Sequence, residues 1–268
     1  MKVITKITRQ KNNQERYNIY LDEEYAFAVD EGILIKFGLM KGKTLEQFDI
    51  DEITYEDEIA KAFNKALHFL SFQMRSEYEV KKKLLDAGHG EAVVLEAVRK
   101  LEALGFLNDQ TYSKALLETK KRTLKKGPRA IRQDLKKKGI DKALQDEVLE
   151  TFTEEEQLEI AMQLAEKEVR AGSRRTPLQL KQKIQDVLMR KGYSFGIVND
   201  VLERIDLERQ DDEWEGLISS QGEKIWRKFA SRLSGAERNL KVKQALYQKG
   251  FPIEVINRFI EEKEQEEA

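Results

Sequence analysis

The sequence predicts a mainly α protein, built from about four tandem three-helix repeats that follow a small N-terminal antiparallel β segment. Three observations predict this fold. The first 50 residues contain short runs of β-branched and aromatic residues, the signature of strands. From about residue 56 the apolar residues recur with the helical period of 3.6. Four glycines then recur 51, 53 and 58 residues apart with apolar positions in register.

The β segment is predicted from three runs, residues 3–8, 16–21 and 25–29. The acidic stretch 22–24 separates the last two runs, which favours a hairpin. Three glycines then interrupt a short apolar stretch, where a capping turn or short helix is expected. We assign residues 1–55 to this N-terminal domain.

The repeat is defined by Gly88, Gly139, Gly192 and Gly250. Apolar residues stand eight and four positions before each glycine, on one face of a helix. Further apolar residues stand five, ten and thirteen positions after it, and only Lys263 breaks the pattern. Each glycine is expected to end a helix, where a positive φ is needed. The predicted repeats span residues 56–109, 110–153, 154–208 and 209–268.

Helix starts support the same division. Ser76 and Glu79, and likewise Ser234 and Glu237, have the spacing of a capping box. Pro128 and the later Pro177 stand where the first turn of a helix tolerates proline. Single repeats of this size bury little apolar surface, so neighbouring repeats are expected to stack.

The composition excludes several classes of site. The chain has no cysteine, which removes disulfides, thiolate metal sites and cysteine nucleophiles and favours a cytoplasmic location. It has no apolar run long enough for a membrane helix and no signal-peptide core. Its two histidines, His68 and His89, lack a metal-ligand pattern, and His89 is expected to be a solvated turn residue.

No cofactor is expected. Gly42-Lys43-Thr44 invites comparison with a phosphate-binding loop, but Phe37 occupies the position where that motif requires glycine. A polar turn is the better interpretation. The acidic runs, including residues 261–267, are read as helix starts, linkers or solvated tails rather than metal sites.

Charge is concentrated in the second repeat. Net charge is only −1, yet residues 114–142 hold twelve Lys or Arg against three acids. This density predicts a surface facing a polyanion or an acidic protein, and the alternative is an ordinary solvated helix face. The candidate binding residues are Lys114, Lys121, Arg122, Lys125, Lys126, Arg129, Arg132, Lys136 and Lys137.

Three motifs resemble those of the RecX family. Residues 75–88 resemble its "RSxxEL…KL…G" opening, and residues 126–140 its "KGPxxIxxELxxKGI" segment. Between them, residues 101–112 resemble "LxxxGFLDDxxYA", in which Gly105, Phe106 and Leu107 form a corner between repeats. Asn108 replaces the family's first Asp, and Ser113 its usual Ala.

This resemblance implies a function that composition does not. RecX proteins regulate the RecA recombinase: they bind the RecA–DNA filament in its groove and generally suppress its ATPase, strand-exchange and coprotease activities. They consist of three-helix repeats and are not enzymes. A fourth repeat and the β segment are typical of the longer members from low-GC Gram-positive bacteria. Expected partners are the RecA filament and single- or double-stranded DNA, with the chain a monomer.

Two other functions remain open at the level of sequence. The chain could bind DNA directly, as a helix-turn-helix regulator, although lysine dominates the basic region and phosphate contact is then favoured over base readout. It could also be a passive helical scaffold. Salt-dependent binding to bare and to recombinase-coated DNA distinguishes the three. Whether a regulator would cap, block or disassemble a filament is not encoded in any motif.

Overall fold

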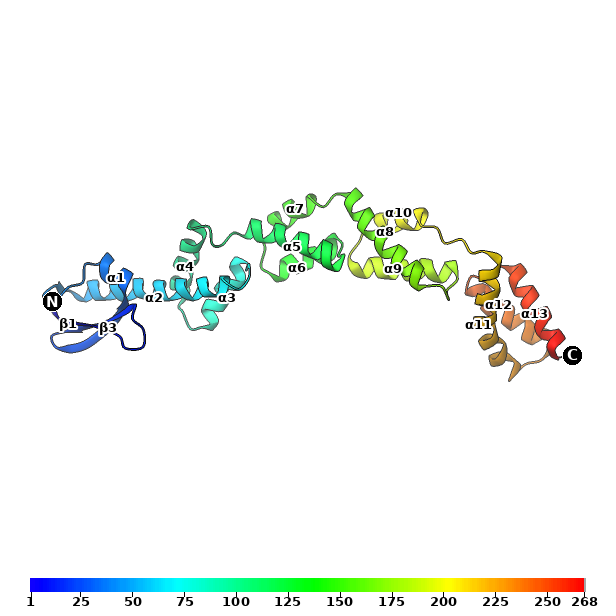
Figure 1. Cartoon of the computed structure of the whole chain (residues 1–268), viewed down its shortest axis with the longest axis horizontal. Helices are drawn as coiled ribbons and strands as arrows, with labels where there is room; N and C mark the ends of the chain where they lie inside the picture. Colours follow the sequence, from blue (N-terminus) through cyan, green and yellow to red (C-terminus); the bar gives the residue numbers. More distant parts are fainter. Residues whose placement is uncertain (268) are drawn as a thin grey trace. The chain divides into compact units, whose positions relative to one another are not determined.

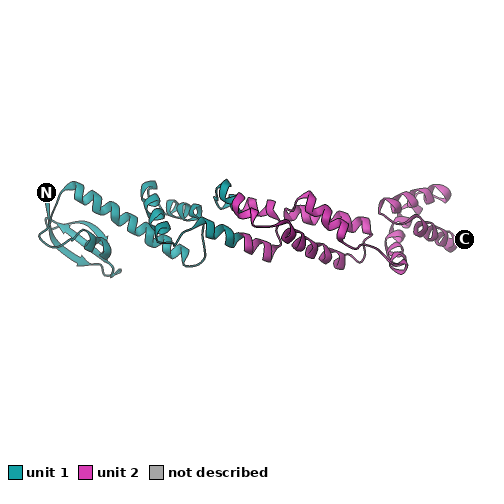
Figure 2. Cartoon of the chain, turned by 90° about the horizontal axis from the view of Figure 1, so that it is seen from above, with its two compact units in different colours: residues 1–116, 135–145 teal, residues 117–134, 146–268 magenta. Residues whose placement is uncertain are grey.

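The computed structural model of the chain describes residues 1–267. These residues form four strands and thirteen helices (Figure 1). The chain divides into two compact units, one of residues 1–116 and 135–145, the other of residues 117–134 and the chain from 146 onward (Figure 2). The second predicted repeat contributes residues to both units.

The N-terminal sheet contains the three predicted strands and one that was not predicted. Strands β1 (Lys2–Arg9), β2 (Arg16–Leu21) and β3 (Glu24–Asp30) are antiparallel. The unpredicted β4 (Thr44–Leu45) pairs with β1, which gives the order β3-β2-β1-β4. The expected turn at Gly42 is present, with φ of +89°.

Two helices cover this sheet. Helix α1 (Glu31–Lys36) is the expected short helix, capped by the side chain of Asp30. Helix α2 (Gln47–Leu70) begins nine residues before residue 56, so the predicted start of the helical part is wrong and the proposed boundary lies inside a helix. The reason is that α2 serves two cores. Ile53 packs with the sheet, whereas Ala62 packs within the first repeat.

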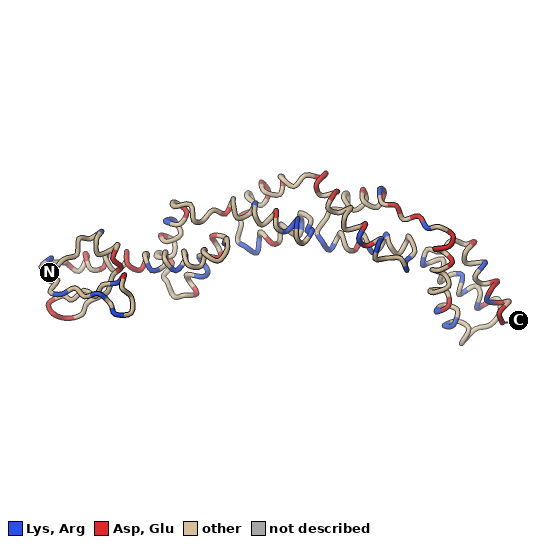
Figure 3. The backbone as a smooth tube through the Cα atoms, viewed as in Figure 1, with Lys and Arg blue, Asp and Glu red and all other residues tan. Residues whose placement is uncertain are grey.

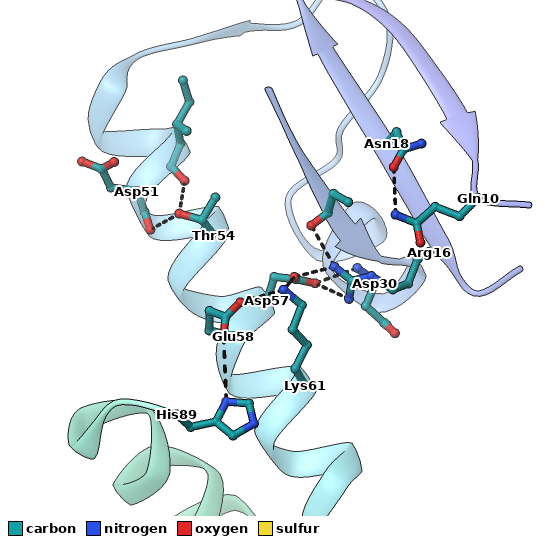
Figure 4. A network of polar contacts seen from close by, with 12 residues as sticks. Gln10, Arg16, Asn18, Asp30, Asp51, Thr54, Asp57, Glu58, Lys61 and His89 are labelled. Carbon is teal, nitrogen blue, oxygen red and sulfur yellow. Dashed lines mark hydrogen bonds and ion pairs between the residues drawn. The ribbon is translucent and has the colours of Figure 1, made fainter. Parts of the chain in front are cut away.

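A buried charged network joins the sheet to α2 (Figure 4). Asp57 of α2 is 2% exposed and accepts hydrogen bonds from the Arg16 guanidinium, at 2.8 and 3.2 Å, and from the backbone N–H of Asp30 at 2.8 Å. Lys61 Nζ lies 3.1 Å from the same carboxylate. Buried charges are retained when they are paired in this way. Next to it, His89 faces Glu58 at 3.8 Å and its side chain is only 12% exposed, so the expectation of a solvated turn histidine is wrong.

The first, third and fourth repeats each close around their own apolar core. Helix α2 packs with α3 (Glu77–Asp86) and α4 (Glu91–Ala103) in the first unit. In the second unit the helices are α8 (Glu154–Ala171), α9 (Pro177–Lys191), α10 (Phe195–Arg204), α11 (Asp211–Ala230), α12 (Gly235–Gln248) and α13 (Ile253–Glu267).

The second repeat consists of α5 (Asp109–Leu124), α6 (Pro128–Lys137) and α7 (Lys142–Glu150). Pro128 begins α6, as predicted, and Pro177 begins α9. The capping box at Ser76 is present, but the Ser234 side chain makes no cap hydrogen bond, so the second predicted box is wrong.

The four repeat glycines all follow a helix end, which confirms the central prediction. Gly88, Gly139, Gly192 and Gly250 have φ between +74° and +92°. At each one, the next residue's N–H donates to the carbonyl of the leucine four positions before the glycine. This is the Schellman arrangement, and these leucines are also fully buried. The same residue column therefore ends the helix and fills the core. The acidic end of the chain belongs to α13, where Glu267 accepts a hydrogen bond from Trp226 at 3.0 Å.

Candidate interaction surface

The loop between α5 and α6 is clamped to the end of α9, within the second unit. The N–H of Gly127 donates to the Lys191 carbonyl at 2.8 Å, and the N–H of Arg129 to the Gly192 carbonyl at 3.1 Å. In return, Lys191 Nζ donates to the Leu124 carbonyl at 2.7 Å. Lys125 adopts a left-handed conformation, φ +51°, and its carbonyl accepts from the Tyr193 hydroxyl at 3.2 Å. Carbonyls that end α9 thus satisfy N–H groups that begin α6.

This clamp depends on two glycines. A Cβ on Gly127 would stand 2.7 Å from the Gly192 backbone, and one on Gly192 would stand 2.4 Å from the Ala130 nitrogen. The backbones approach too closely for any side chain. The start of α6 is therefore held rigidly, and its N–H groups are occupied. Only its side chains are available to a partner.

The nine candidate cations divide into two groups. The first group is exposed: Arg129 has no ion-pair partner among residues 1–267, and the Arg122 side chain is 80% exposed beside Glu118 at 3.3 Å. Lys114, Lys136 and Lys137, from the parts of α5 and α6 that belong to the first unit, are also exposed and without an ion pair in the described chain. These five side chains retain their charge for an external partner.

The second group is engaged within the protein. The Lys121 side chain is only 8% exposed, lies 2.7 Å from both Glu118 and Glu156, and covers the Phe152 ring at 5.4 Å. Its burial lowers the Lys121 pKa, but the two carboxylates outweigh burial and the pKa lies above its usual value. Lys121 therefore forms structural ion pairs inside the protein and is not the surface cation that the sequence pattern predicted.

Three more candidates of this second group have partners. Lys126 Nζ lies 2.6 Å from Asp134, Arg132 pairs with Asp146, and Lys125 Nζ donates to the Gln163 side chain. Lys125 and Lys126 are partly buried, whereas Arg132 stays exposed despite its pair. Exposed pairs of this kind contribute little stability and can exchange partners.

Sequence reasoning missed a neighbouring basic helix. Helix α9 carries four Lys or Arg against one acid, and Lys181 and Arg190 are exposed. In Figure 3, Lys and Arg follow the start of α6 and continue along α9. The excess of Lys and Arg in residues 177–191 is visible in the sequence, but the candidate cations were chosen from the second repeat alone, where Lys and Arg are denser.

In the first unit, a cluster around Glu79 attaches the end of α6 to α3. Its carboxylate accepts from Lys138 at 2.6 Å, from the Tyr112 hydroxyl at 3.2 Å and from the Ser76 N–H at 3.2 Å. Burial raises the Glu79 pKa, but the Lys138 ammonium and the Ser76 N–H outweigh it, so the pKa lies below its usual value. Burial also raises the pKa of Tyr112. Close by, Gly139 touches Tyr78, with no room for a Cβ.

The Gly-Phe-Leu corner places one apolar residue inside and one outside. Gly105 has φ +75°, Leu107 is buried in the first repeat, and Phe106 is 54% exposed. Phe106 borders a hollow of about 400 Å³ that also touches Met74. The Asn108 side chain accepts from the Thr111 N–H at 2.8 Å, so it caps α5 as the family's Asp would.

Two classes of feature are absent from residues 1–267. No helix among them is both long and apolar enough to cross a bilayer. No three His, Asp or Glu side chains among them gather in a way that could hold a metal ion.

Comparison with known families accounts for nearly the whole chain. The "Regulatory protein RecX N-terminal domain" model matches residues 2–46. The first and second three-helix domain models of RecX match residues 62–101 and 108–149. The third three-helix domain model matches twice, at residues 154–202 and 211–260. The fourth repeat thus resembles a second copy of the third.

Full-length relatives and solved structures agree with this pattern. The chain is 41% identical over 263 residues to "Regulatory protein RecX" of Bacillus licheniformis, and 40% identical over 265 residues to that of Bacillus subtilis strain 168. Each alignment covers 98% of this chain and all of the relative. A "Crystal structure of regulatory protein RecX" superposes with a TM-score of 0.66 at 38% identity, covering 76% of this chain and all of the other. RecX from Lactobacillus salivarius gives 0.54 at 34% identity, covering 57% of this chain and 99% of the other.

Proposed function

This chain belongs to the RecX family of regulatory proteins, and on that premise we propose that it is a non-enzymatic modulator, mainly a negative regulator, of a RecA recombinase. It binds the RecA–DNA filament in the cytoplasm as a monomer and alters ATPase, strand-exchange and coprotease activity. The family assignment supports this proposal, and so do the five exposed cations of the basic helices, of which all but Arg122 make no ion pair within residues 1–267.

Within this proposal, the five exposed cations of α5 and α6, called the basic face below, contact the filament. Arg122, Arg129, Lys136 and Lys137, with Lys114, meet DNA phosphates or an acidic stretch of the recombinase. Lys121 is not part of this contact because its charge is already balanced by Glu118 and Glu156. Lysine and arginine on rigid helices suit phosphate, which is recognised by charge rather than by base sequence.

Regulation follows from many weak contacts. Successive repeats can each touch the filament, and later contacts become effectively intramolecular once the first has formed. A regulator of this kind changes filament activity only if it prefers one filament state over another. No catalytic group is needed for that effect.

The test neutralises exposed cations that make no ion pair within residues 1–267. Arg129→Gln, Lys136→Gln and Lys137→Gln remove three exposed, unpaired charges, and Arg132 is left intact because it pairs with Asp146. The control removes three equally exposed, unpaired charges elsewhere, as Lys65→Gln, Lys82→Gln and Lys167→Gln. Both triple variants are measured for inhibition of recombinase ATPase on single-stranded DNA and for filament binding at several salt concentrations.

We expect the basic-face variant to bind more weakly and the control to behave like the parent. If the lost contacts are to phosphate, the slope of log affinity against log salt falls by about 0.7 to 0.9 per contact. Inhibition that survives in the folded basic-face variant at every salt concentration would show that this face is merely solvated. Binding to bare DNA as tight as to coated DNA would instead favour the alternative of a direct DNA-binding protein.

A further inference from the structure

A groove runs along the seam between α8 and α10 of the third repeat, inside the second unit. Its apolar surface comes from Leu158 and Met162 of α8 and from Ile197 of α10, and it encloses about 560 Å³. A second hollow of about 340 Å³ continues along the same seam. The two share Met162, and the second adds Val169 and Ile205.

The walls of the groove are acidic. The first hollow is lined by five carboxylates, namely Glu154, Glu155, Glu159, Glu166 and Asp200, and by one cation, Arg204. The second hollow adds one acid, Asp206, and one cation, Arg170. None of the five has an ion pair or a side-chain hydrogen bond within residues 1–267, although ion pairs are frequent elsewhere in the protein.

The fold explains only part of this charge. Glu154 and Glu155 lie in the first turn of α8, where the helix dipole stabilises acids. Glu159 and Glu166 lie further along α8, and Asp200 lies on α10, beyond that effect. Glu155 and Glu159 are one turn apart, where like charges destabilise a helix. Unpaired carboxylates that border an apolar floor are complementary to a cationic, partly apolar ligand.

The length of the groove indicates a polymer rather than a small molecule. Its lining extends along α8 from Glu154 to Arg170, which at about 1.5 Å per residue is roughly 24 Å. That length accommodates about four turns of a partner helix. An amphipathic helix places apolar side chains in such a groove at every third or fourth residue.

We propose that the α8–α10 groove docks a basic amphipathic helical segment of a partner protein. Apolar side chains of that segment lie on Leu158, Met162 and Ile197, and its lysines and arginines pair with Glu155, Glu159 and Glu166. This surface goes beyond the proposed function, because it is separate in residues and opposite in charge from the basic face. Besides the lining arginines, Lys125 reaches the groove through its hydrogen bond to Gln163.

The test uses the full-length protein and a synthetic probe. The probe is a fluorescent 15-residue peptide of leucine and lysine with leucine on one helical face, compared with a scrambled peptide of the same composition. Binding is followed by fluorescence anisotropy. The groove variant is Glu155→Gln, Glu159→Gln and Glu166→Gln. The control removes the same charge from exposed, unpaired acids outside the groove, as Glu150→Gln, Glu203→Gln and Glu261→Gln.

The amphipathic peptide should bind the parent and the control alike, and the groove variant about tenfold more weakly, since three solvent-exposed charge pairs are lost. Equal binding of the scrambled peptide, or equal weakening by the control variant, would overturn the proposal in favour of general acidity. Concentration-dependent self-association that the groove variant abolishes would identify a second copy as the occupant and also overturn it. The assay contains neither recombinase nor DNA, so its failure is distinct from failure of the filament proposal.

Discussion

The substitution Gly250→Ala tests the contact between the third and fourth repeats through its effect on the free energy of unfolding. Its φ is +86°, and a Cβ placed on it would stand 2.6 Å from Cβ of Leu178, at the start of α9. Next to this contact, the Thr176 hydroxyl donates to the Lys249 carbonyl. Gly250→Ala therefore imposes two costs, a strained backbone and an overlap with the neighbouring repeat.

Gly235 separates these two costs, because it lies in the same repeat with φ +55° and nothing within 4 Å of its added Cβ. Gly235→Ala carries the left-handed backbone penalty alone, about 1–2 kcal/mol. Gly250→Ala adds an overpacking cost of about 1–3 kcal/mol. We expect a total loss of about 2–5 kcal/mol at Gly250, a large part of the stability of a repeat this small.

Tryptophan fluorescence during urea unfolding measures both losses. The chain has two tryptophans, and Trp214 and Trp226 both belong to the fourth repeat. The Gly250→Ala midpoint should fall further than that of Gly235→Ala by about 0.3–3 M, which is the extra cost of about 1–3 kcal/mol divided by a urea slope of about 1–3 kcal/mol per M. Equal midpoints would refute the reasoning, because they would mean that Leu178 does not contact residue 250 in solution.

Two further stability predictions concern the first unit. Glu79→Gln should cost about 1–3 kcal/mol at neutral pH by leaving Lys138 and Tyr112 with a weaker acceptor. The folded pKa of Glu79 lies below the ordinary value of 4.5. The ionised Glu79 therefore contributes its full share of the folding stability above pH 4.5, and this share is lost as the pH falls through the folded pKa. Urea midpoints of parent and variant should therefore converge in acid, and a constant gap would contradict the assignment. Asp57→Asn should leave the partly buried Arg16 guanidinium without its carboxylate partner, at a cost of about 3 kcal/mol, the lower end of the range for a broken buried pair. The loss should be detected as faster hydrogen exchange in β2, and unchanged exchange would show that the pair is not formed.

The repeat was predictable because each of its signals has one physical cause. A glycine with positive φ and a leucine four positions earlier both belong to the helix end, so they recur at fixed spacing. The start of α2 was not predictable in the same way. Its apolar residues serve the sheet core first, through Ile53, and the repeat core later, through Ala62. A helix whose buried face changes along its length has no single stripe, and the helical period becomes visible only part-way along it.

The sequence predicts where Lys and Arg are dense, but it does not predict which of these side chains stay free to bind a partner. Lys121 belongs to the same basic run as Arg122, yet Lys121 is buried against Glu156 while Arg122 is exposed. Its partner stands 35 residues away on α8, and no local pattern encodes that distance. Likewise Arg132 is paired by Asp146 of α7, whereas Arg129, one turn earlier on α6, is not. Which cations stay unpaired is decided by tertiary packing.

The net charge of −1 conceals a separation of charge within the second unit. Glu156 of α8 pairs with Lys121 of α5, whereas Glu155 and Glu159 line the groove shared with α10. Removing three groove carboxylates makes the whole chain more positive, which favours attraction to a polyanion. General electrostatics therefore predicts that the groove variant binds a DNA-containing filament at least as well as the parent. Weaker filament binding by that variant would have the wrong sign for a bulk charge effect, and only a direct contact at the groove would explain it.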